Sequence, residues 1–266
     1  LRLSFLRSHI IPISTLYLGR VYAYDLPWHH PWVMILATTP FFTAIAILAG
    51  LFGLAVKKFK DSDGGLFAIV ALTFMISFML PSSPGHDGIR LFLPALPFLA
   101  GLSGWGINFI LKRRDDSSRV KNRLVEYIIA ASLLLPSASG LIIVHPYELA
   151  YYSGLVGGIK GANRLGFETT FWLDVLNQDT LKEINSILPP GASLFPIFPR
   201  YGCRHLEFLR DGGFLRRDIR ITQRDAGWYL LIGRQGLFSD FERLIYDAGF
   251  PVWELKKRGV TLAALY

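Results

Sequence analysis

The chain has 266 residues, of which 52% are hydrophobic and 18% charged, and its mean hydropathy is +0.37. Because an ordinary globular chain carries about 25% charged residues, this composition excludes a single water-soluble domain and a disordered chain. The lone cysteine, Cys203, excludes a scaffold built on internal disulfides.

The depletion of charge is confined to four windows in the first part of the chain. Residues 33–56, 64–81, 91–111 and 124–144 contain one charged side chain between them, Glu126. A helix needs about 20 largely apolar residues to cross the hydrocarbon core of a bilayer. Buried core helices can be equally apolar, but this chain lacks the polar shell that four of them would need. We therefore expect an α-helical membrane protein with about four transmembrane helices.

Basic residues predict how these helices are oriented. Nine of them fall in the loops 57–63 and 112–123, whereas the intervening loop 82–90 has only Arg90. The positive-inside rule places both basic loops in the cytoplasm. Residues 1–32, the loop 82–90 and the segment 145–266 are then predicted outside the bacterial inner (plasma) membrane. Residues 1–32, rich in Tyr and Trp, are expected to form an interfacial loop. Since no span precedes this loop, we expect the C-terminal half of a longer protein.

Residues 145–266 predict a small extracytoplasmic α/β domain. Apolar spacing indicates helices at 178–188, 203–210 and 238–248. Strands are predicted at 192–198, 219–222 and 227–232, and a closing hairpin at 251–255 and 260–266. The 15 basic and 13 acidic side chains of this segment give no reason to expect nucleic acid as a partner. Neither a metal-ligand spacing nor a nucleotide-binding glycine loop occurs, so no metal and no cofactor are predicted.

Polar residues near the outer ends of the predicted spans are the first candidate site. His29 and His30 precede the first span, and the loop before the third span carries His86, Asp87 and Arg90. An arginine at that depth can bind a lipid phosphate through two hydrogen bonds. The alternative is that the histidines suit the headgroup region and that Arg90 extends to ordinary headgroups.

A second candidate follows the fourth span. Glu168 and Trp172 lie close in sequence, with Asp174 nearby. A carboxylate together with an aromatic ring is a common way to bind a sugar. A salt-bridged acid where the domain meets the membrane is the alternative explanation.

Three stretches resemble the C-terminal half of bacterial GT-C membrane glycosyltransferases. Within that class, the chain is similar to the dolichyl-phosphate-mannose–protein mannosyltransferase-like group, which includes the aminoarabinose transferases of lipid A. The stretches are Tyr17-Leu18-Gly19-Arg20-Val21-Tyr22 with Leu26-Pro27-Trp28-His29-His30-Pro31-Trp32-Val33, then His86-Asp87-Gly88-Ile89-Arg90-Leu91-Phe92-Leu93-Pro94-Ala95-Leu96-Pro97, and His145-Pro146-Tyr147-Glu148 through Gly166-Phe167-Glu168 to Phe171-Trp172. His29 and His30 stand where aromatic residues are common in the family.

The resemblance implies transfer of a sugar from a polyprenyl-phosphate donor to an extracytoplasmic glycan, lipid or protein acceptor. It implies that Arg90 steadies the lipid phosphate and that His29 and His30 border the same cavity. The catalytic aspartate of such enzymes is expected upstream of Leu1, so no catalytic residue is assigned here, and Asp25 does not take that role. A non-enzymatic flippase or transporter of lipid-linked glycans, or a glycan-binding membrane subunit, is the alternative.

Overall fold

The computed structural model describes residues 13–23, 26–57, 62–80, 83, 85, 87–111, 119–198 and 202–266, and it divides into two compact units. The helical unit comprises Tyr22–His145 and Tyr151–Gly158, and the α/β unit comprises Ser14–Val21, Pro146–Ala150 and Ile159–Tyr266. The predicted boundary at residue 145 is therefore only approximate. Residues 14–21, expected in an interfacial loop, belong to the α/β unit because they pair with segments far along the chain.

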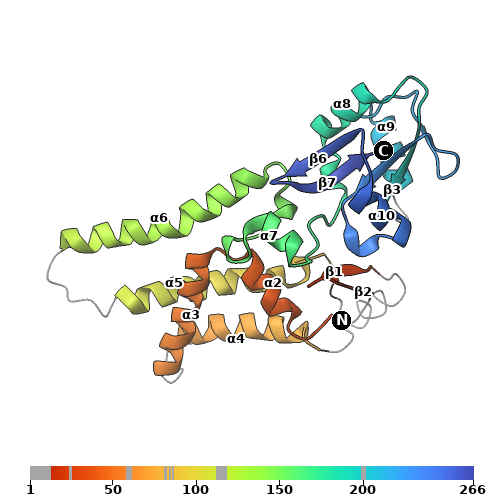
Figure 1. Cartoon of the computed structure of the whole chain (residues 1–266). Coiled ribbons are helices and arrows are strands. Elements are labelled where there is room, and N and C mark those ends of the chain that lie inside the picture. The colour runs from red at the N-terminus through yellow and green to blue at the C-terminus, as the bar shows by residue number, and fades with distance from the viewer. Residues whose placement is uncertain are drawn as a thin grey trace. The chain divides into compact units, whose positions relative to one another are not determined.

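The helical unit is a set of apolar helices (Figure 1). Its elements are α2 (His30–Thr38), α3 (Phe41–Val56), α4 (Ser62–Ser77), the 3₁₀ helix η1 (Arg90–Ala95), α5 (Leu96–Leu111), α6 (Arg119–Val144) and the short η3 (Gly154–Val156).

The window 33–56, predicted as one span, is two helices. Thr39 is extended, with ψ 130°, and Pro40 separates α2 from α3. A proline disfavours the helical conformation of the residue before it, so Pro40 forces this break. The window 91–111 is also divided, because its first turns, which contain Pro94, form η1 rather than α-helix.

Small residues bring α3 and α5 into close contact. A Cβ atom on Gly106 would lie 2.3 Å from the carbonyl oxygen of Ala46 and 2.5 Å from the backbone nitrogen of Gly50. A Cβ atom on Gly50 would lie 2.5 Å from the carbonyl oxygen of Leu102. The two backbones therefore approach each other more closely than any larger residue would permit.

Within the described residues, two helical segments, Arg90–Leu111 and Arg123–Val144, are long and apolar enough to cross a membrane, judged by length and composition. The apolar helices Phe41–Val56 and Asp63–Ser77 are shorter. Many large apolar side chains on these helices are exposed, among them Leu48, Phe52, Leu66, Ile69, Leu134, Leu135 and Ile142.

The α/β unit is built on a five-stranded sheet of order β4-β3-β5-β7-β6. Its strands are β3 (Ser193–Ile197), β4 (Arg220–Ile221), β5 (Trp228–Ile232), β6 (Trp253–Lys257) and β7 (Val260–Leu265). β3 pairs in parallel with β4 and β5, and β7 pairs antiparallel with β5 and β6. A separate two-stranded sheet joins β1 (Thr15–Tyr17) and β2 (Arg20–Tyr22).

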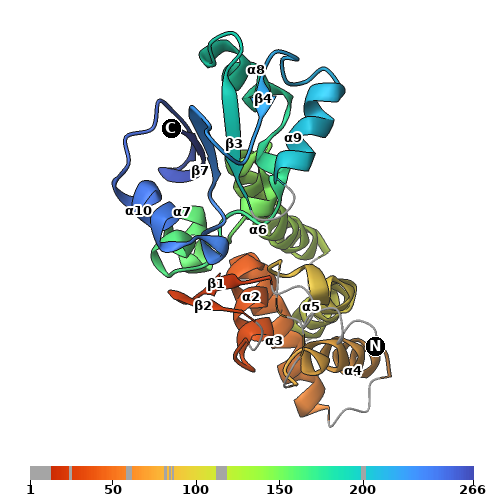
Figure 2. The same cartoon turned by 90° about the vertical axis from the view of Figure 1, so that its right-hand side faces the viewer.

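The helices of this unit are α7 (Gly158–Arg164), α8 (Gln178–Ile187), α9 (Gly202–Asp211) and α10 (Asp240–Ala248), with 3₁₀ turns at Glu148–Ala150 (η2), Leu173–Val175 (η4) and Gln235–Leu237 (η5). In Figure 2, α9 and α10 lie on either side of β3 and β7. Leu181 and Ile184 of α8 and Leu206 of α9 pack on Leu194 and Leu230 in the main core.

The predicted secondary structure of the tail is confirmed. Each predicted helix and strand is present with ends shifted by no more than a few residues. Asn177 caps α8 by accepting a hydrogen bond from the backbone nitrogen of Thr180 at 3.0 Å. Ser239 and Glu242 form a capping box at the start of α10. Because these capping residues lie next to the helices that they cap, the sequence alone could predict where α8 and α10 begin.

Candidate functional site

The start of α2 buries one histidine and leaves its neighbour partly accessible. Pro31 occupies the first turn, where its missing N–H costs nothing. The imidazole of His30 is buried and packs edge-on against Phe92, with ring centroids 6.0 Å apart. Burial, together with the smaller effect of the neighbouring His29, lowers the pKa of His30 to about 4. His30 is therefore neutral at physiological pH, while His29 packs edge-on against Trp28.

Asp87, in the loop before η1, contacts Arg90, the first residue of η1. Nη1 of Arg90 donates to Oδ2 of Asp87 at 3.3 Å, and the side chain of Asp87 is 2% exposed while that of Arg90 is 57% exposed. Asp87 and Gly88 both have φ of 62°, so the loop adopts a conformation that a non-glycine residue rarely takes. A buried carboxylate thus pairs with a guanidinium whose side chain is more than half exposed. His86, predicted beside them, lies outside the described residues.

Aromatic and sulfur contacts bring the start of α2, the end of α4 and η1 to one place. Phe92 of η1 packs against His30 and also against Phe78, with ring centroids 6.0 Å apart in both pairs. The indole Nε1 of Trp32 donates to Sδ of Met79 at 3.0 Å. The predicted neighbours His30 and Arg90 consequently belong to the same end of the helical unit.

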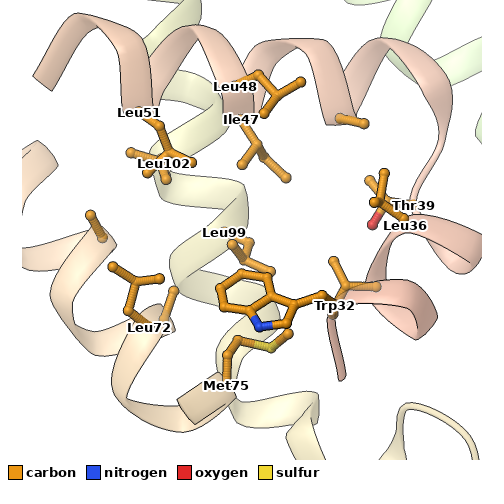
Figure 3. Close-up of a pocket in the computed structure, with 14 residues that line it drawn as sticks. Trp32, Leu36, Thr39, Ile47, Leu48, Leu51, Leu72, Met75, Leu99 and Leu102 are labelled. Carbon is orange, nitrogen blue, oxygen red and sulfur yellow. The ribbon is translucent and has the colours of Figure 1, made fainter. Parts of the chain in front are cut away.

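An apolar cavity of about 220 Å³ lies between α2, α3, α4 and α5. Figure 3 shows the indole of Trp32 beside Met75, and Leu51 beside Leu102. The lining residues are Trp32, Ile35, Leu36, Thr39, Ala44, Ile47, Leu48, Leu51, Ala68, Ala71, Leu72, Met75, Leu99 and Leu102. Its walls are almost wholly hydrocarbon, so the cavity suits an alkyl or isoprenoid chain and not a sugar. Trp32 lies two residues beyond His30, and Leu99 follows η1.

Sequence reasoning did not identify this cavity or the role of Phe92. Trp32 falls at the end of the stretch predicted as an interfacial loop, and Phe92 falls in a predicted span. Pro40 was the one sequence signal that pointed to the cavity. Because Pro40 ends α2, the helices α2 and α3 can line different sides of the cavity.

The second candidate site, Glu168 with Trp172, has a buried carboxyl group. Glu168 is 2% exposed, and its carboxyl oxygens accept hydrogen bonds from three backbone N–H groups. The ring of Trp172 is 43% exposed at the start of η4. Burial raises the pKa of Asp174 to about 6. Because its oxygens face backbone amides, Glu168 presents no open carboxylate to a sugar in this structure.

Among the residues that the structure describes, no three His, Cys, Asp or Glu side chains are close enough to hold a metal ion. The chain matches no protein-family model, no curated protein and no solved structure. The family resemblance therefore depends on the quoted sequence stretches alone.

Proposed function

We propose that the chain is part of a membrane glycosyltransferase that uses a polyprenyl-phosphate-linked sugar as donor. The observations that carry this proposal are an apolar cavity lined by Trp32 and Leu99 and, in the same helical unit, a buried Asp87 that pairs with the more than half-exposed Arg90. A polyprenyl phosphate has the matching chemistry, with a long hydrocarbon chain attached to an anionic head.

A membrane location is the first part of the proposal. We propose that α3, α4, η1 with α5, and α6 cross the bilayer, and that the nine-residue α2 lies at its outer face. Exposed side chains such as Phe52, Ile69 and Ile142 support this, because they would form costly apolar patches in water and favourable contacts in lipid. The close glycine packing of α3 against α5 supports it as well. With the basic loops in the cytoplasm, the α/β unit is extracytoplasmic.

The proposed chemistry is nucleophilic substitution at the anomeric carbon of the donor. An acceptor hydroxyl oxygen forms the new bond to that carbon while the bond from carbon to phosphate oxygen breaks. The hydroxyl proton passes to a general base, and polyprenyl phosphate leaves with the electron pair. Arg90 stabilises the negative charge that develops on the leaving phosphate, because charge-assisted hydrogen bonds to phosphate are strong. His30, neutral and buried against Phe92, supplies no charge.

Replacing Arg90 in the full-length protein tests this assignment. We expect Arg90→Ala to abolish sugar transfer while the protein still inserts and folds, because the leaving phosphate loses its charged partner. Arg220→Ala, an exposed arginine on the sheet edge, is the matched control and should retain wild-type turnover. Wild-type turnover in Arg90→Ala would refute the role of Arg90.

The alternative is a flippase, transporter or glycan-binding subunit without transferase activity. Such a protein would bind the lipid-linked sugar without releasing polyprenyl phosphate. Measuring release of the lipid product therefore separates the two classes.

A further inference from the structure

Glu168 joins three segments of the α/β unit that are distant in sequence. Its Oε1 atom accepts from the backbone nitrogen of Gln235 at 2.7 Å. Its Oε2 atom accepts from the backbone nitrogens of Gly236 at 2.8 Å and Leu16 at 3.3 Å. The side chain thus connects β1 and the start of η5 to the segment that follows α7.

Backbone contacts extend this junction along the segment Ser14–Val21. The nitrogen of Glu168 donates to the carbonyl oxygen of Leu16 at 3.1 Å, and the nitrogen of Gly19 donates to that of Gly166 at 3.0 Å. The ring of Tyr17 packs edge-on against Phe167, with centroids 5.8 Å apart. The docked segment therefore has its own set of hydrogen bonds and a buried aromatic anchor.

Two glycines make the junction too tight for any added methyl group. A Cβ atom on Gly166, whose φ is +75°, would lie 2.1 Å from the nitrogen of Gly19. A Cβ atom on Gly236 would lie 2.6 Å from both Oε2 of Glu168 and the nitrogen of Leu16. Packed this closely, the junction leaves Glu168 only 2% exposed to water.

The charged surroundings of Glu168 only partly offset this exclusion of water. Arg234 faces the carboxyl group and donates from Nη1 to the carbonyl oxygen of Phe171. Tyr246 of α10 interacts with it electrostatically, and Arg243 donates to the carbonyl oxygen of Gln235 at 3.1 Å. Burial raises the pKa of Glu168 to about 7, against the opposing effects of the three amides and Arg234.

We propose that Glu168 is a proton-sensitive latch that holds the segment Ser14–Val21 on the α/β unit and loosens as its carboxyl group ionises. In the docked state the group binds its proton tightly, whereas after release it would be hydrated and have its ordinary pKa of 4.5. Protons therefore favour the docked state, and docking weakens as the pH rises through 7. An ionised carboxylate regains on release the hydration that the buried site withholds. This latch goes beyond the transferase chemistry and does not depend on it.

Hydrogen–deuterium exchange of the full chain in detergent micelles tests the latch. After correction for intrinsic exchange rates, we expect the protection of residues 14–21 to fall about tenfold between pH 6 and pH 8. Peptides from the central strand β5 (Trp228–Ile232) serve as the internal reference and should keep their protection. An equal loss in both regions would mean global unfolding and would overturn the proposal, as would constant protection of residues 14–21.

A neutral variant assigns the titration to this side chain. Glu168→Gln keeps the shape of the side chain but carries no titratable proton, so protection of residues 14–21 should become independent of pH. Glu207→Gln, at an exposed position on α9, is the matched control and should retain the tenfold change. A pH dependence that persists in Glu168→Gln would assign the effect to another group and would overturn the latch.

Discussion

The close contact between α3 and α5 makes Gly106 the most sensitive small residue of the helical unit. Gly106→Ala would place a methyl group 2.3 Å from the carbonyl oxygen of Ala46 and 2.5 Å from the nitrogen of Gly50. Both neighbours are backbone atoms, so no side-chain rotation relieves the clash. Reaching an ordinary van der Waals distance requires the helices to separate by about 1 Å, and such overpacking costs about 1–3 kcal/mol.

Gly104 is the matched control on the same helix. A Cβ atom there meets nothing within 4 Å, so Gly104→Ala gains helix propensity of up to about 1 kcal/mol without a clash. The measurement is the free energy of unfolding of both variants in mixed micelles titrated with dodecyl sulfate, followed by circular dichroism. We expect Gly106→Ala to be less stable than Gly104→Ala by about 2 kcal/mol or more. Equal stabilities would refute close α3–α5 packing.

Two further predictions concern the cavity and a helix cap. Ala71→Phe, at a buried position that lines the cavity, should block binding of undecaprenyl phosphate in a competition assay, whereas Ile69→Phe on the exposed face of α4 should leave binding unchanged. Ser239→Ala removes the side-chain cap of α10 and should destabilise that helix by about 1 kcal/mol. Local hydrogen exchange measures this loss, Ser239→Asp should restore protection, and equal protection in all three proteins would contradict it.

The elements of the α/β unit could be predicted because their signals are local. The helix α8 has apolar residues at helical spacing and an Asn177 cap, and the strand β5 is nearly all apolar. The turn Arg258–Gly259, where both residues have positive φ, carries the glycine expected of a hairpin. Each of these features is contained in a few consecutive residues.

The latch around Glu168 could not be predicted, because its partners are remote in sequence. Leu16 is 152 residues away and Gly236 is 68 residues away. The sequence offered a carboxylate near Trp172, which favoured a sugar site, and gave no indication that backbone amides surround it. The hairpin of β1 and β2 was not predicted either, although its turn, Leu18-Gly19, has positive φ at both residues and carries a glycine as a local signal.

The candidate site of the helical unit was predictable in part. Asp87 and Arg90 are three residues apart, so their pairing at 3.3 Å follows from local geometry. The cavity depends on the packing of four helices and on the separation of α2 from α3 at Pro40. The pattern of apolar residues within one helix does not show how that helix packs against three others, so the cavity could not be predicted.

Photoaffinity labelling tests directly whether the helical unit holds a site for the donor lipid. The full-length protein in lipid nanodiscs is exposed to an undecaprenyl phosphate that carries a diazirine in its chain, and labelled residues are mapped by mass spectrometry. The proposal predicts labelling at lining positions such as Leu72, Met75 and Leu99, suppressed by excess undecaprenyl phosphate but not by undecaprenol. Equal labelling of the exposed α6 residues Leu134 and Leu135, unaffected by competitor, would contradict it.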